Sequence, residues 1–160
     1  MSVTIEHEVP VDTVDGLYQS RYEAELRRAT LLVGSAAVAQ DVVSEAFCDV
    51  IRRWDSIREP AAYLNRAVLN GCRQAGKRRR REAPTDPAEQ ALAGRTVSDE
   101  FDHLADAVET LPWKQRAVVV LKYYEGRTEA EIAEQLGIRP GSVGPTARRA
   151  LDRLRKEVAR

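Results

Sequence analysis

Aromatic residues, cysteines and histidines are scarce in this 160-residue sequence. Aromatic side chains make up 6% of it, and there are two cysteines, Cys48 and Cys72, and two histidines, His7 and His103. The cysteines lie in helical patterns without metal-ligand spacing, which argues against a disulfide or zinc site and predicts buried thiols in a reducing compartment. Neither histidine belongs to a nucleophile or metal motif, so we expect no catalytic residue, metal or cofactor.

Membrane-spanning and targeting patterns are absent as well. No apolar stretch reaches the roughly 20 residues that a transmembrane helix needs. The N-terminus also lacks the basic-then-apolar order of a signal peptide. We therefore expect a cytoplasmic protein without membrane insertion. With 43% apolar residues, the chain has enough material for one folded core or two small ones.

The formal net charge of +0 conceals blocks of opposite sign. Residues 61–81 hold 7 basic and no acidic side chains, and residues 111–160 hold 11 basic and 6 acidic ones. Residues 82–110, between them, hold 8 acidic side chains and 1 basic one. Two basic blocks separated by an acidic one predict two surfaces that face a polyanion. The alternative interpretation is that both blocks are merely solvated helix faces.

Helical periodicity predicts three helices before the acidic block. They cover about residues 15–33, 38–54 and 60–81. Gly34 is a predicted helix stop, and Ser35 is a predicted N-cap. Pro60 suits the first turn of the third helix, since a proline there loses no hydrogen bond.

The pattern along the chain predicts an all-α protein with two small helical domains. Residues 1–12 show no periodicity and are predicted to be a loose tail. Residues 82–99 contain two prolines, one glycine and little apolar spacing. We interpret them as a flexible acidic linker between domains at residues 13–81 and 100–160.

Two short helical segments are predicted after the linker. Phe101, Leu104 and Val108 mark the first of them. The second begins at Pro112 and ends at Gly126. Its predicted buried residues are Ala117, Val118, Leu121 and Tyr124.

The rest of the chain has the spacing of a helix-turn-helix. The predicted elements are a short helix at residues 128–136, a turn at 137–141 and a longer helix at 142–158. Residues 128–131 read TEAE, which is a capping box, and Ser142 is the predicted N-cap of the longer helix. Gly144 and Pro145 then fall in its first turn, where the amides have no intrahelical acceptor.

The outer face of the longer helix is basic. In a helix-turn-helix, the N-terminal part of this helix enters the major groove and later basic residues meet phosphates. The residues predicted to form or support this DNA contact are Arg139, Ser142, Val143, Gly144, Thr146, Arg148, Arg149 and Arg153. An ordinary surface helix in a bundle is the alternative.

A second nucleic-acid surface is predicted on the helix at residues 60–81. Arg66, Asn70 and Arg73 recur at helical spacing on one face, and Tyr63 lies near its start. Aromatic, amide and guanidinium groups can stack on unpaired bases and hydrogen-bond to them, while a basic cluster contacts phosphates. The alternative is that Tyr63 packs in the core and that the basic run is a solvated helix end.

Three segments carry a family resemblance. They are DVVSEAF (residues 41–47), RRWDSIREPAAYLNRAVLN (52–70) and LPWKQRAVVVLKYYEGRTEAEIAEQLGI (111–138). They resemble the extracytoplasmic-function sigma factors of bacteria, and the resemblance covers about residues 15–158. The arginine-rich composition resembles actinobacterial members. The resemblance implies a sigma region 2 at 13–81, a sigma region 4 at 100–160, and binding to core RNA polymerase and promoter DNA.

The resemblance also implies roles for particular residues. Asp41, Glu45 and Phe47 would dock on the clamp coiled coil of the polymerase β′ subunit, and region 4 would meet the β flap. The residues implied to capture and hold the melted minus-ten element are Trp54, Ser56, Arg58, Tyr63, Arg66, Asn70, Arg73, Lys77 and Arg78. The helix from Ser142 would read the minus-thirty-five element. The linker and the docking faces are candidate targets of an anti-sigma factor.

Several positions depart from the common family pattern. Tyr63 stands where many relatives have tryptophan, Gln74 stands where aspartate is usual, and Gly144-Pro145-Thr146 replaces a frequent Lys-Ser-Arg. Promoter preference therefore does not transfer from relatives, and more of the recognition falls to DNA shape and phosphate contacts. The alternative function is a helix-turn-helix regulator with an unrelated helical domain, which would bind duplex DNA without polymerase.

Overall fold

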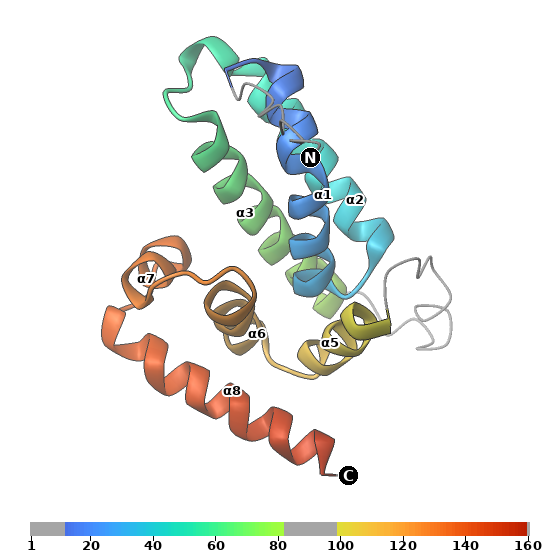
Figure 1. The fold of residues 1–160 in the computed structure, drawn as a ribbon, viewed down its shortest axis with the longest axis vertical. Helices are drawn as coiled ribbons and strands as arrows, with labels where there is room; N and C mark the ends of the chain where they lie inside the picture. Colours follow the sequence, from blue (N-terminus) through green and yellow to red (C-terminus); the bar gives the residue numbers. More distant parts are fainter. Residues whose placement is uncertain (1–11, 82–98, 160) are drawn as a thin grey trace, which may run out of the picture.

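A computed structural model describes residues 12–81 and residues 99–159. We call the first range the first half and the second range the second half. In the first half, α1 (Val14–Val33), α2 (Ala36–Arg52) and α3 (Pro60–Arg81) lie side by side, with the 3-10 turn η1 (Trp54–Ser56) before α3 (Figure 1). The second half contains α5 (Asp99–Glu109), α6 (Trp113–Val119), the π-helical turn η2 (Val120–Tyr124), α7 (Glu129–Leu136), the 3-10 turn η3 (Pro140–Ser142) and α8 (Val143–Val158).

These elements confirm the predicted fold class, because the described residues form helices and turns only. The predictions made for residues 1–11 and 82–98 lie outside the described residues. Asp99, which was assigned to the linker, is the first residue of α5.

The predicted helix ends of the first half are confirmed. Gly34 ends α1 in the left-handed region with φ 74, which only glycine adopts without a steric penalty. The Ser35 hydroxyl then accepts a hydrogen bond from the Val38 amide at 3.3 Å and caps α2. Two adjacent residues therefore stop one helix and start the next.

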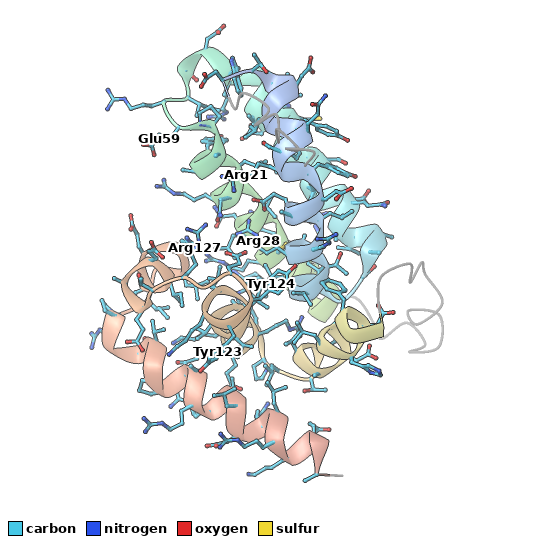
Figure 2. All side chains as sticks on the ribbon, viewed as in Figure 1. Arg21, Arg28, Glu59, Tyr123, Tyr124 and Arg127 are labelled. Carbon is cyan, nitrogen blue, oxygen red and sulfur yellow. The ribbon has the colours of Figure 1, made fainter. Side chains whose placement is uncertain are left out.

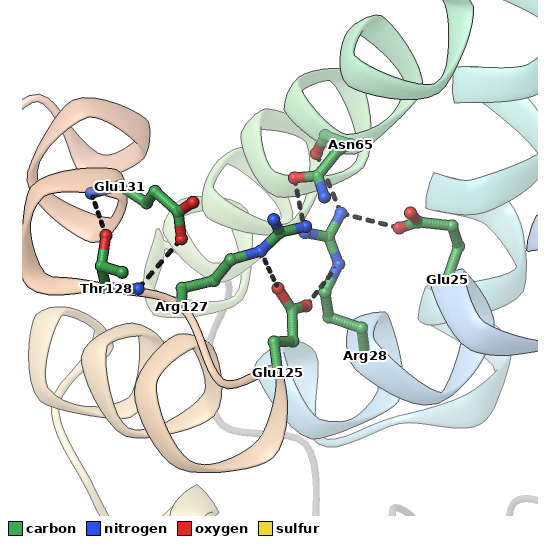
Figure 3. A network of polar contacts seen from close by, with 7 residues as sticks. All are labelled: Glu25, Arg28, Asn65, Glu125, Arg127, Thr128 and Glu131. Carbon is green, nitrogen blue, oxygen red and sulfur yellow. Dashed lines mark hydrogen bonds and ion pairs between the residues drawn. The ribbon is translucent and has the colours of Figure 1, made fainter.

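The capping box of the second half is confirmed too. The Glu131 amide donates to Thr128 Oγ1 at 3.2 Å, and the Thr128 amide donates to Glu131 Oε2 at 2.9 Å (Figure 3). Gly137 ends α7 with φ 64. Both ends of this eight-residue helix thus satisfy backbone groups that would otherwise lack partners.

One apolar cluster fills the first half and continues into the second. Its first-half members come from the facing sides of the three helices and include Leu17, Leu32, Val43, Val50, Leu64 and Val68. From the second half it takes in Val108, Leu111, Ala117, Val119, Val120 and Ala150. The sequence left the relative placement of the halves open, and the structure packs them against one another across the C-terminal part of α1 (Figure 1).

A smaller cluster forms the core of the helix-turn-helix. Its members are Val118, Leu121, Ile132, Ala133, Val143 and Ala147. Because Val118 belongs to this cluster while Ala117 and Val119 belong to the larger one, α6 lies between the two cores. The orientation of α7 and α8 is therefore tied to the packing of α6 on the first half.

A buried arginine also joins the halves. Arg28 on α1 has a side chain only 3% exposed. Its Nη2 donates to Glu25 Oε2 at 2.7 Å and to the Asn65 carbonyl at 2.9 Å, and its Nη1 donates to Asn65 Oδ1 at 2.8 Å. From the second half, Glu125 Oε1 lies 3.2 Å from Arg28 Nε (Figure 3). The guanidinium therefore binds groups from both halves.

The prediction that Tyr124 is buried is wrong. The helix from residue 113 changes to a π-helical turn at Val120–Tyr124, and the Glu125 amide donates to the Val120 carbonyl at 3.0 Å. A π turn holds one extra residue and rotates the positions that follow it. Leu121 remains fully buried, whereas Tyr123 and Tyr124 are 54% and 42% exposed (Figure 2).

The two cysteines differ in their surroundings. Cys72 is buried, as predicted, and burial raises the pKa of its thiol to about 12. Cys48 is exposed on α2, so the prediction that it is buried is wrong. It follows Glu45 by three positions and shares the solvent face of that helix.

Two glycines of α3 give matched tests of the packing between α2 and α3. A Cβ at Gly71 would lie 2.7 Å from Val42 Cγ1, whereas a Cβ at Gly76 would meet nothing within 4 Å. We expect Gly71→Ala to lower the free energy of unfolding by roughly 1–2 kcal/mol, because the α2–α3 contact becomes overpacked. Gly76→Ala should raise it by roughly 0.5–1 kcal/mol through helix propensity.

Urea unfolding followed by circular dichroism measures both changes. A Gly71→Ala protein as stable as Gly76→Ala would contradict the close approach of α2 to α3.

Candidate nucleic-acid and polymerase surfaces

Helix α8 begins differently from the prediction. Ser142 does not act as an N-cap, because its backbone is already helical and its hydroxyl donates to the Arg139 carbonyl at 2.7 Å. Pro140 opens a 3-10 turn that leads directly into α8, and the Ser142 amide donates to the same carbonyl at 3.0 Å. Proline has the φ that a first helical turn requires, so the helical path starts at Pro140.

The inner face of α8 includes two of the residues predicted for the DNA contact, because positions 143, 146 and 150 recur at i, i+3 and i+7 on one side of a helix. Val143 and Thr146 were predicted to contribute to the DNA contact, but they are 0% and 1% exposed. The Thr146 hydroxyl donates to the Ser142 carbonyl at 2.6 Å, so it is occupied within its own helix. Gly144 is partly buried beneath Glu129. Neither Val143 nor Thr146 offers a group to DNA in this structure.

The exposed residues of this region form what is named here the α8 surface. It consists of Arg139, Arg148, Arg149 and Arg153, which are all exposed, with Ser142 and Gly144 partly exposed at its edge. Four guanidinium groups on the outer side of a helix-turn-helix match the chemistry of a phosphate backbone. The second helix of this motif is also the one that enters the major groove in known complexes.

The α3 surface is a second row of polar groups. Arg66, Asn70, Lys77 and Arg78 are exposed and Arg73 is partly exposed. Arg73 Nη2 lies 3.5 Å from Asn70 Oδ1, so the amide and the guanidinium are neighbours. Helical spacing places Arg66, Asn70, Arg73 and Lys77 on one side, where bases and phosphates could reach them, and Arg78 about 100° further around the helix.

The sequence allowed Tyr63 either to pack in the core or to contact unpaired bases, and the structure leaves its ring only partly buried. Its ring is partly buried against the apolar cluster, and its hydroxyl donates to Asp49 Oδ2 on α2 at 2.5 Å. This hydrogen bond is the main reason why the pKa of Tyr63 is raised and that of Asp49 is lowered. Asp49 also pairs with Arg53 at 3.2 Å. Sequence reasoning missed Asp49, which lies 14 positions before Tyr63.

The turn before α3 holds the other predicted minus-ten residues. Trp54 is partly buried against the apolar cluster, while Ser56 and Arg58 are exposed. The Ser56 hydroxyl donates to the Arg53 carbonyl at 2.9 Å, which closes η1. The turn therefore presents one polar and one basic side chain next to the start of the α3 surface.

Only part of the predicted polymerase contact is exposed. Asp41 and Glu45 share the solvent face of α2. Phe47 is 4% exposed, so the expectation that it offers an aromatic anchor is wrong for this structure. The physical reason is helical geometry, because two residues beyond Glu45 is about 200° around the helix.

Tyr18 is an exposed aromatic side chain in this region, and sequence reasoning did not identify it. Its ring centroid lies 4.8 Å from that of Tyr22 and 5.1 Å from that of Phe47. Tyr18 is 47% exposed, and Ile51 on α2 is 51% exposed. Asp41, Glu45, Tyr18 and Ile51 are named here the α1–α2 surface. Exposed large apolar side chains are a common mark of a protein contact.

The described residues contain neither a candidate metal site nor a helix suited to span a membrane. No group of three or more histidine, cysteine, aspartate or glutamate side chains in residues 12–81 and 99–159 could hold a metal ion. Within the same ranges, no helix combines the length and the apolar character that crossing a bilayer requires.

Comparisons with known proteins connect these surfaces to one family. A family model described as "Sigma-70, region 4" matches residues 102–154. The RNA polymerase sigma-E factor of Streptomyces avermitilis is 35% identical over 146 residues, which cover 88% of this chain and 82% of that protein. The ECF RNA polymerase sigma factor SigM of Mycobacterium tuberculosis is 32% identical over 146 residues, which cover 88% of this chain and 74% of that protein.

A solved structure has the same fold. The sigma factor RpoE of Bartonella quintana, crystallised with the anti-sigma factor NepR, superposes with a TM-score of 0.69 at 19% identity. The superposition covers 91% of this chain and 96% of that one. The sequence matches include both halves, and the relatives from Streptomyces and Mycobacterium confirm the actinobacterial resemblance. The chain belongs to the ECF family of RNA polymerase sigma factors.

Proposed function

We propose that this chain binds core RNA polymerase in the cytoplasm, directs the enzyme to a subset of promoters and helps to open the duplex. The observation that carries the proposal is that family relatedness covers 88% of the chain, so it includes both the α3 surface and the α8 surface. A helix-turn-helix regulator with an unrelated first domain would match in the second half alone. The proposal assigns no chemical step to the chain itself.

The α8 surface would contact the upstream promoter element. Arg148, Arg149 and Arg153 are exposed, and their guanidinium groups can bind phosphates in two-pronged geometry. Because Thr146 and Val143 are buried, few side chains at the start of α8 can form hydrogen bonds with base edges. We therefore expect the binding free energy at this element to come chiefly from phosphate contacts.

The α3 surface would hold the melted strand. Asn70 can donate and accept hydrogen bonds on a base edge, and Arg66 and Arg73 can stack on bases or bind phosphates. Tyr63 contributes its ring while Asp49 fixes its hydroxyl. Single-stranded bases expose edges and faces that a duplex hides, so such a surface favours the open strand.

The α1–α2 surface would dock on polymerase. Its carboxylates suit a basic partner surface, and Tyr18 and Ile51 supply apolar area that is already exposed. Phe47 supports Tyr18 from beneath, with ring centroids 5.1 Å apart. In this proposal, Tyr18 is the anchor and Phe47 holds the anchor in place.

A reconstituted transcription assay tests the function. Purified chain, core RNA polymerase and promoter DNA selected from cellular polymerase complexes should give open complexes, detected by permanganate reactivity of unpaired thymines. The chain alone should bind the same duplex weakly. Tight dimeric binding without polymerase, together with no open complex when polymerase is present, would refute the proposal.

Arg149 tests the α8 surface. Arg149→Ala should weaken binding of the holoenzyme to the upstream element and lower the slope of log K against log salt by about one counterion. The matched control is Arg27→Ala, because Arg27 is an exposed arginine of α1 and belongs to neither the α8 surface nor the α3 surface. Fluorescence anisotropy at several salt concentrations measures both slopes. Equal slopes for Arg149→Ala and the wild type would remove Arg149 from the contact.

Variants of Tyr18 and Phe47 distinguish a contribution to polymerase binding from a contribution to the packing of the fold. Tyr18→Ala should lower the affinity for core RNA polymerase and change the unfolding free energy by less than about 1 kcal/mol, because its ring is half exposed. Phe47→Ala should cost roughly 3–5 kcal/mol of stability. Arg27→Ala is the control, since Arg27 is exposed on α1 and, nine positions after Tyr18, lies on the opposite side of that helix. Full polymerase affinity in Tyr18→Ala would exclude it as the anchor.

A further inference from the structure

The α3 surface does not end on α3, because Tyr63 connects it to α2. Tyr63 lies three positions before Arg66 and seven before Asn70, so these residues share one side of the helix. The Tyr63 hydroxyl donates to Asp49 Oδ2 on α2 at 2.5 Å. The other oxygen of that carboxylate, Oδ1, lies 3.2 Å from Arg53 Nε. Tyr63, Asp49 and Arg53 are named here the Asp49 network.

Arg53 is held through its backbone as well as its side chain. Its carbonyl accepts hydrogen bonds from the Ser56 amide at 2.9 Å, the Ser56 hydroxyl at 2.9 Å and the Ile57 amide at 3.1 Å. Its own amide donates to the Asp49 carbonyl at 3.1 Å. The side chain is nevertheless 62% exposed, so a ligand can reach it. A long side chain that is placed beforehand loses less conformational entropy when it binds.

We propose that Arg53, positioned by Asp49 and Tyr63, contacts a backbone phosphate of the unpaired strand that the α3 surface holds. This inference rests on the proposed function, because it takes the strand to lie on the α3 surface. The terminal nitrogens of a guanidinium form the fork that binds phosphate, and the contact with Asp49 uses Nε instead. Arg53 would therefore touch the strand, while Asp49 and Tyr63 are positioning residues.

The charges around Asp49 leave a net attraction for phosphate. Arg52 Nη2 also lies 3.5 Å from Asp49 Oδ1, so one carboxylate stands beside two guanidinium groups and the three charges sum to +1. The pKa of Asp49 is lowered, chiefly because Tyr63 donates a hydrogen bond to it, and both arginines act in the same direction. The carboxylate is therefore ionised at neutral pH and attracts both arginines.

The location of the Asp49 network suits a strand that runs along α3. Tyr63 precedes Asn70 by seven residues, which is about 10 Å of helix. Stacked nucleotides follow one another at about 3.4 Å along a strand. A strand whose base is bound at Asn70 would therefore pass the Asp49 network roughly three nucleotides away. Arg53 would extend the contact with that strand beyond the first turn of α3.

The alternative is that the Asp49 network only stabilises the fold. The hydrogen bond from Tyr63 to Asp49 joins α3 to α2, and it serves that purpose without Arg53. The ion pair between Asp49 and Arg53 is largely exposed, and exposed ion pairs contribute little to stability. This pair does restrict where the guanidinium can lie, which matters for a ligand more than for the fold.

Arg53→Ala tests the phosphate contact. Holoenzyme made with each variant would bind fork DNA, a labelled promoter fragment whose minus-ten strand is unpaired, at several salt concentrations. Loss of one phosphate contact with a single strand should reduce the magnitude of the slope of log K against log salt by about 0.7. The affinity should fall about three- to tenfold. Wild-type slope and affinity in Arg53→Ala would overturn the contact.

A matched control and a modified strand sharpen this test. Arg27→Ala removes an exposed arginine of α1 outside the α3 and α8 surfaces and should keep the wild-type slope. Replacing single phosphates of the unpaired strand by uncharged methylphosphonates locates the contact. At one position the replacement should weaken binding of the wild type but not of Arg53→Ala. Equal responses of the two proteins at every position would also overturn the contact.

Tyr63→Phe tests the positioning role. The substitution removes one hydroxyl, changes no charge at neutral pH and keeps the ring that packs against the apolar cluster. Because the hydroxyl holds the carboxylate that orients Arg53, this uncharged change should still reduce the magnitude of the salt slope, by at most about 0.7. A role in packing or base stacking alone leaves the slope unchanged. A wild-type slope in Tyr63→Phe would therefore refute the positioning role.

Double-mutant cycles show whether the hydroxyl acts through Asp49 and Arg53. Once Arg53 is alanine, Tyr63→Phe should have no further effect on the affinity for fork DNA, and the same should hold once Asp49 is alanine. Losses that simply add in either cycle would contradict the link. Urea unfolding of each variant, followed by circular dichroism, establishes that the compared proteins are folded.

The outcomes separate this inference from the proposed function. If the wild-type chain forms no holoenzyme, or if that holoenzyme does not bind fork DNA, the proposed function fails and the Arg53 contact fails with it. If the wild type binds fork DNA and opens promoters while Arg53→Ala behaves identically, the inference alone fails. A reduced slope in both Arg53→Ala and Tyr63→Phe, with no added effect in the cycles, supports the Asp49 network.

Discussion

A guanidinium that is removed from water must keep hydrogen-bond partners, and the arrangement of this sigma factor depends on how Arg28 meets that requirement. Glu25 binds it within α1 and Asn65 binds it from α3, so the guanidinium links those two helices. Glu125 then approaches the one side that remains. The second half thus meets a charge that the first half already holds, at a contact across which one apolar cluster also continues.

The helix boundaries could be predicted from the sequence because they depend on neighbouring residues. Gly34 must adopt positive φ, the Ser35 hydroxyl reaches an amide three residues ahead, and Thr128 and Glu131 satisfy each other's amides. Each of these devices operates within four residues of chain, so its chemistry can be recognised in the local sequence. The fold class follows from the same local rules, together with helical periodicity.

The errors arose where the backbone departs from an ideal helix or where partners are distant in sequence. The 3-10 turn at Pro140 shifts the start of the helical path, so Ser142 is not the N-cap of α8, and the π turn before Glu125 moves Tyr124 into solvent. A regular helical wheel cannot anticipate either change. The ion pair between Arg28 and Glu125 joins residues 97 positions apart, and in the sequence each of them is indistinguishable from a surface charge.

The two surfaces that we propose for DNA contact differ in what they can recognise, and this difference has a physical basis. At the start of α8 the hydroxyls of Ser142 and Thr146 donate to carbonyls of their own turn, so the exposed groups are mainly guanidinium groups. Such groups respond to phosphate position and groove shape as much as to base identity. The α3 surface adds the Asn70 amide, which can both donate to a base edge and accept from it. A duplex hides much of that edge and an open strand exposes it, so selectivity for sequence and selectivity for melted DNA would depend on the same side chain.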